Sequence, residues 1–132
     1  MQAYRQSAAR WNQPAAAATI VLLVLTGVML LALFSRTPPH PPLEVAPFAL
    51  GPFLGASLAI GAAALWAVSH EARHAWLPAA LFALTALVSF GPQKYFDPAF
   101  SRIWPAVIAG QVAIIVLAVW CAVALRYRKS DS

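Results

Sequence analysis

Four long apolar runs, separated by short polar segments, dominate the pattern of this chain. They cover about residues 15–34, 46–69, 75–92 and 103–125, and none of them contains Asp, Glu, Lys, Arg or His. A helix crosses the hydrocarbon core of a bilayer with about 20 apolar residues, so each run predicts a transmembrane helix. The third run is the shortest, because its central part from Trp76 to Phe90 would rise only ~22 Å as a helix. Local thinning of the bilayer can accommodate such a short span.

The runs together predict an all-α fold, an integral membrane four-helix bundle made of two transmembrane hairpins. We expect one transmembrane domain over residues 1–132. The first run is longer than the apolar part of a signal peptide, about 7–15 residues, and therefore predicts a retained span. Four prolines between Thr37 and Pro42 favour an extended polyproline spacer between the first two spans.

The segment between the third and fourth runs mixes aromatic and charged residues. Asp97 followed by Pro98 is typical of a helix N-cap and its first helical residue, and Pro105 predicts a kink or a restart. The pattern predicts a short amphipathic interfacial helix between spans three and four. It favours aromatic anchoring in the headgroups or, alternatively, a ligand or partner site. The candidate partner or lipid contacts are Lys94, Tyr95, Phe96, Asp97, Arg102 and Trp104.

Composition narrows the protein class. Hydrophobic residues make up 61% of the 132 residues and charged residues only 10%, against roughly 45–50% and about 25% in soluble domains. This excludes a soluble globular domain and a disordered chain, and the single cysteine, Cys121, excludes a disulfide scaffold. The net charge of +5 comes from residues at the ends of the runs. We therefore expect contact with lipid headgroups and no binding of nucleic acid.

The distribution of Lys and Arg predicts the orientation. With four spans, the termini and the middle loop share one side, which carries six basic residues: Arg5, Arg10, Arg73, Arg126, Arg128 and Lys129. The opposite side carries three: Arg36, Lys94 and Arg102. Because cytoplasmic loops carry the excess of Lys and Arg, we expect both termini in the cytoplasm. The richness in alanine and proline suggests a bacterial source, and thus the bacterial inner (plasma) membrane.

Residues His70, Glu71 and His74 form the string H-E-x-x-H. On a helix, the two histidines would share one face and could bind zinc, with the glutamate as a base. A catalytic zinc site also needs a third ligand, and the other candidates lie across the membrane or in the C-terminal tail. We therefore expect a solvated turn, with no metal and no cofactor, and keep His70 and His74 as the only candidate metal ligands.

Small residues within the spans indicate close helix packing. Glycine, alanine and serine recur four residues apart in the second and fourth runs, which lets helices approach closely in lipid. Gln111 is the only large polar side chain in a span, and we expect it to bond a neighbouring helix. The candidate packing residues are Gly51, Gly55, Gly61, Gly110 and Gln111.

These features favour a multi-pass membrane protein without an evident catalytic site. Intramembrane transport usually retains an ionisable residue inside the membrane, and the runs have none. The first hypothesis is an accessory, assembly or stabilising subunit of a larger membrane complex, bound to other membrane subunits or to itself. One alternative is a small dimeric transporter or channel. Another is a membrane metalloenzyme that uses the His70–His74 string.

Overall fold

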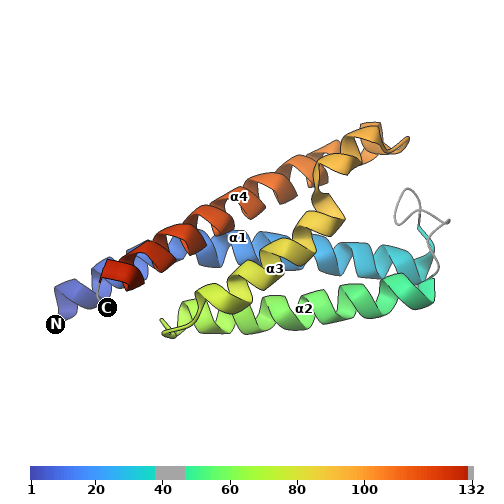
Figure 1. Ribbon diagram of the computed structural model, residues 1–132. Coiled ribbons are helices and arrows are strands. Elements are labelled where there is room, and N and C mark those ends of the chain that lie inside the picture. The colour runs from blue at the N-terminus through green and yellow to red at the C-terminus, as the bar shows by residue number, and fades with distance from the viewer. Residues whose placement is uncertain (38–46, 131–132) are drawn as a thin grey trace.

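The computed structural model describes residues 1–37 and 47–130 and has four long helices (Figure 1). They are α1 (Gln2–Ser35), α2 (Pro47–Ser69), α3 (Trp76–Phe90) and α4 (Phe100–Ser130), with a 3-10 helix η1 (Pro92–Phe96) between α3 and α4. The predicted all-α four-helix bundle is confirmed. The predicted polyproline spacer, from Pro38 onwards, lies outside the described residues.

Each of the four helices has a segment long and apolar enough to cross a membrane. These segments are Arg10–Ser35, Phe48–Ser69, Trp76–Phe96 and Phe100–Ser130. The third candidate span continues from α3 through η1, which provides the length that α3 alone lacks. The chain is therefore a multi-pass membrane protein with four candidate spans.

The helices form a ring in which each packs against its neighbours along the chain, and α1 closes the ring against α4. The two termini and the turn between α2 and α3 lie at one end of the bundle (Figure 1). We call this the terminal end. The opposite end carries η1, and we call it the loop end. This arrangement follows from two antiparallel hairpins whose connections alternate between the ends.

Two helices end in the same hydrogen-bonded motif. At the end of α1, the Arg36 N–H bonds the Leu33 carbonyl (3.3 Å) and the Thr37 N–H bonds the Ala32 carbonyl (3.1 Å), with Arg36 in the left-handed conformation (φ 52°). This is a Schellman motif, which satisfies carbonyls that the helix leaves free.

At the end of α2, the Glu71 N–H bonds the Val68 carbonyl (3.3 Å) and the Ala72 N–H bonds the Ala67 carbonyl (2.9 Å). Glu71 has a φ of 53°. A left-handed residue cannot continue a right-handed helix, so the chain turns away from the α2 axis at this point.

The core consists of apolar side chains from all four helices. Its largest fully buried side chains include Leu22 of α1, Leu54 of α2, Phe82 of α3 and Leu117 of α4. Lipid tails are as apolar as leucine, so packing and hydrogen bonds, rather than exclusion from water, hold such a bundle together. Side-chain fit is therefore the main stabilising factor at these positions.

The predicted separate interfacial helix between spans three and four is wrong. The Asp97 carboxylate accepts a hydrogen bond from the Ala99 N–H (2.8 Å), and the Asp97 carbonyl accepts one from the Phe100 N–H (2.9 Å). This turn leads directly into α4, which continues through Pro105. Pro105 lies near the start of the helix, where its missing N–H leaves only the carbonyl of the exposed Ser101 without its helical partner. The helix therefore does not restart at Pro105, which was one of the two predicted outcomes.

Candidate functional site

The loop end is ordered by a hydrogen bond between η1 and α4. The Tyr95 hydroxyl donates to the Gln111 side-chain carbonyl at 2.6 Å. The Tyr95 ring also lies against Phe100, with the ring centroids 5.1 Å apart. From the sequence, Tyr95 was a candidate partner or lipid contact and Gln111 a candidate helix-packing residue. In the structure their side chains bond each other, so Gln111, the one large polar side chain of the predicted spans, is bonded to the loop.

The Gln93 side chain holds the backbone before Tyr95, and a long ion pair lies across it. The Gln93 side-chain amide donates to the carbonyls of Val88 (2.7 Å) and Leu87 (3.3 Å), and so caps the last turn of α3. The ammonium of Lys94 lies 3.8 Å from the Asp97 carboxylate. Sequence reasoning missed the role of Gln93, although a glutamine directly after a Gly-Pro helix terminator is a suitable signal for a side-chain cap.

Against this fixed backbone, two aromatic side chains project outward. Phe96 is 91% exposed and Trp104 is 53% exposed. Arg102, two residues before Trp104 on α4, is also exposed. We use the name loop face for these three exposed residues of η1 and the start of α4: Phe96, Arg102 and Trp104. It combines apolar rings with a cation that can bind lipid headgroups or an acidic partner.

We predict that Tyr95→Phe lowers the free energy of unfolding by about 0.6 kcal/mol, the average for hydrogen bonds between membrane helices, whose maximum is about 1.7 kcal/mol. The variant keeps the ring against Phe100 and removes only the hydroxyl that bonds Gln111. Unfolding by SDS in mixed micelles, followed by circular dichroism, measures the change. Tyr127→Phe is the matched control, because Tyr127 is 67% exposed and keeps its ring contact with Trp11 as phenylalanine. Equal stability of the two variants would contradict a contribution from the Tyr95–Gln111 bond.

The H-E-x-x-H string is not on a helix. It lies in the turn between α2 and α3, and Glu71 in its left-handed conformation separates the two histidines. The His70 ring stacks on Trp66 (centroids 4.7 Å apart), with Nδ1 2.8 Å from the Trp66 carbonyl oxygen, whereas His74 Nε2 lies 3.5 Å from Arg128. The shared helix face that a zinc site of this type needs is therefore not formed. Within residues 1–37 and 47–130, no three His, Cys, Asp or Glu residues gather into a metal-binding group.

The candidate packing glycines have different surroundings. A Cβ atom added at Gly61 would lie 2.6 Å from both the Leu23 and the Phe82 side chains, and one at Gly110 would lie 2.9 Å from Phe90. A Cβ at Gly51 would make ordinary contacts with α1 at 3.8 Å or more, and one at Gly55 would meet nothing within 4 Å. Among these four glycines, side chains of neighbouring helices pack closely only against Gly61 and Gly110.

The arrangement at the loop end is suited to binding, since it presents aromatic rings and cations on a fixed backbone. No protein-family model matches the chain, and no curated protein or solved structure matches it either.

Proposed function

We propose that this protein is an accessory, assembly or stabilising subunit of a larger complex in the bacterial inner membrane, and that it docks a partner subunit through the loop face. The observation that carries the proposal is the 91% exposure of Phe96 on a backbone held by neighbouring side chains. Aromatic residues and arginine are enriched among the residues that dominate binding energy at interfaces. A fixed backbone lowers the entropy lost on binding.

The transporter alternative has less support. Its candidate polar residue, Gln111, is bonded to Tyr95. Of the buried polar side chains in the described residues, Thr19 and Ser57 donate their hydroxyls to carbonyls of their own helices. A conducting path needs polar groups that bind and release its cargo, and neither observation supplies them.

Copurification tests the proposed docking. We expect the tagged wild-type chain, extracted in mild detergent, to elute as a complex with a second membrane protein in fixed stoichiometry. Phe96→Ala should weaken the association by about 30-fold, corresponding to about 2 kcal/mol for a dominant interface residue. Quantitative mass spectrometry of the eluted complex measures the ratio of the two chains.

Phe48→Ala provides the matched control for this experiment. Phe48 is also an exposed aromatic residue, 83% accessible, and lies in the first turn of α2 at the loop end. Its replacement should leave the complex intact. Recovery of only the free chain, or the same loss with both variants, would contradict docking through Phe96.

The proposal places both termini in the cytoplasm. Arg10, Arg73, Arg126 and Arg128 support this orientation, because they lie in the segments of the terminal end, whereas Arg36, Lys94 and Arg102 lie at the loop end. A fluorescent protein fused after Ser132 should fluoresce, and alkaline phosphatase fused there should be inactive. A phosphatase inserted in the segment 38–46 should be active. The reverse pattern would overturn the orientation.

A further inference from the structure

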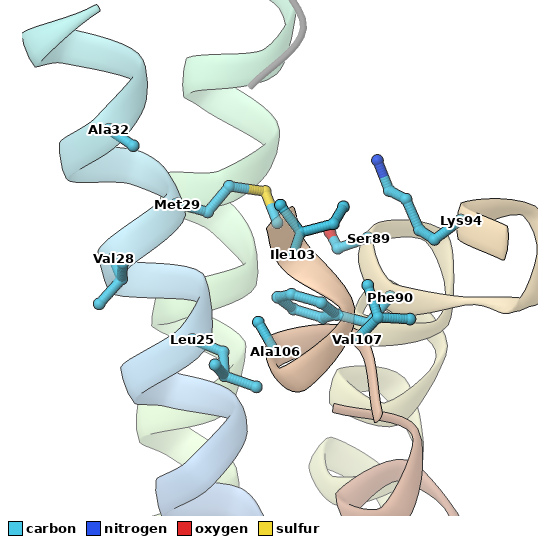
Figure 2. A pocket seen from close by; sticks show the side chains of 10 residues that line it. All are labelled: Leu25, Val28, Met29, Ala32, Ser89, Phe90, Lys94, Ile103, Ala106 and Val107. Carbon is cyan, nitrogen blue, oxygen red and sulfur yellow. The ribbon is translucent and has the colours of Figure 1, made fainter. Parts of the chain in front are cut away.

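A cavity of about 80 Å³ lies at the loop end, where α1 faces the end of α3 and the start of α4 (Figure 2). Leu25 and Met29 line it from α1, Phe90 from α3, Ile103 and Val107 from α4, and Lys94 of η1 lies at its edge. The cavity is partly open, so it is accessible from the surroundings of the bundle. It is unrelated to the loop face, whose side chains point outward.

The size and lining of the cavity indicate what can fill it. It has about half the volume of a 150 Å³ apolar cavity that binds benzene, so it suits a short segment of a hydrocarbon chain. Apolar cavities stay dry, and its wall contains only two polar residues, Ser89 and Lys94. At the level of the predicted membrane spans, the available apolar molecules are lipids.

Lys94 supplies charge complementarity at the edge. A lysine at the edge of an apolar site can lay its apolar stem along the site and place its ammonium at the polar interface. In Figure 2 the Lys94 side chain extends from η1 and ends in its nitrogen above Ser89. Its distance of 3.8 Å from Asp97 is longer than a charge-assisted hydrogen bond, about 2.7–2.9 Å. Its donors can therefore serve a second anion.

We propose that this cavity binds one acyl chain of an anionic glycerophospholipid from the adjacent leaflet, with the lipid phosphate beside Lys94. The apolar lining supplies the affinity for the acyl chain, and the Lys94 ammonium supplies the preference for an anionic headgroup. This inference does not depend on the proposed docking of a partner, because it uses the side of the loop that faces the bundle interior. A lipid held here would fill the space between α1 and α4.

Native mass spectrometry of the purified chain tests the inference. The probes are dioleoyl phosphatidylglycerol and dioleoyl phosphatidylcholine, which share acyl chains and differ in headgroup charge. We expect one phosphatidylglycerol to bind about fivefold more tightly than phosphatidylcholine, which corresponds to about 1 kcal/mol for a lysine near an anionic headgroup. Lys94→Gln should abolish the preference and Lys94→Arg should retain it. Arg36→Gln, at the same end but outside the cavity, should leave it unchanged.

Variants that fill the cavity with a larger side chain test the binding of the acyl chain separately. Ala106→Leu should reduce the binding of both lipids, whereas Ala109→Leu, at an exposed position of the same helix, should not. Ala32→Leu fills the cavity from α1 and replaces Ala106→Leu if that variant does not fold. Equal binding of the two lipids to the wild-type chain, unchanged binding after filling, or full competition by free oleate would overturn the proposal. None of these results depends on the partner measured with Phe96→Ala.

Discussion

Phe82→Ala is expected to lower the free energy of unfolding of the bundle by about 3 kcal/mol. Phe82 is fully buried on α3 and lies in the main apolar cluster. In soluble cores, Phe→Ala costs about 3–5 kcal/mol, part of which is transfer from water. That part is smaller in lipid, where packing is the main source of stability, so the lower end of the range applies. Unfolding by SDS in mixed micelles, followed by tryptophan fluorescence, measures the change.

Leu84→Ala is the matched control for Phe82→Ala. Leu84 lies on the same helix and is 62% exposed, so it faces lipid before and after unfolding within the micelle. Its truncation should change the free energy of unfolding by less than about 0.5 kcal/mol. If Phe82→Ala were as stable as Leu84→Ala, the centre of the bundle would not depend on tight packing.

The number and type of the helices could be predicted from the sequence, because the four runs contain no charged residue. A charge within a membrane span is costly, so hydropathy alone separates span from loop. Hydropathy does not show how far a helix continues beyond the membrane into water. The first span was expected from about residue 15, yet α1 begins at Gln2. The Trp11–Tyr127 ring contact (6.3 Å) and the Asn12–Val68 hydrogen bond (3.4 Å) support this extension, and both depend on tertiary structure.

The candidate site was only partly predictable for a related reason. Its aromatic and charged residues could be identified from the sequence, but their partners could not. The Tyr95–Gln111 bond joins residues 16 apart and requires η1 to fold back along α4. Nothing in the local pattern distinguishes that conformation from an interfacial helix, which was the prediction. Similarly, the left-handed conformation of Glu71 gives no local signal, because glycine is the residue that usually marks such a turn.

The loop end therefore has two sides with different surroundings. Its outward side presents Phe96 and Trp104, and its inward side contributes Lys94 to the edge of an apolar cavity. The Tyr95–Gln111 bond lies between these two sides and holds η1 against α4. Tyr95→Phe should consequently weaken both partner docking and the preference for an anionic lipid. The loss of docking should be smaller than that of Phe96→Ala, and the loss of lipid preference should be smaller than that of Lys94→Gln.

The second large effect is expected at Gly61, where α2 meets α1 and α3. Gly61→Val should lower the free energy of unfolding by about 2–3 kcal/mol, since a Cβ there would lie 2.6 Å from the Leu23 and Phe82 side chains. Leu23 can move the end of its side chain, whereas the Phe82 ring is fully buried in the core. The same SDS titration measures the loss. Gly55→Val on the same helix is the control, since an added Cβ there meets nothing within 4 Å.

A double-mutant cycle assigns the cost at Gly61 to the Phe82 ring. Phe82→Leu removes the ring carbon nearest the added Cβ, so the loss in the Gly61→Val/Phe82→Leu double variant should be smaller than the sum of the two single losses. Residues in contact show such coupling at about 0.5–3 kcal/mol, whereas distant pairs are additive within about 0.5 kcal/mol. Additive losses would show that the strain at Gly61 is relieved through Leu23 alone. Coupling above 1 kcal/mol would identify the Gly61–Phe82 contact as the point that sets the spacing of α2 and α3.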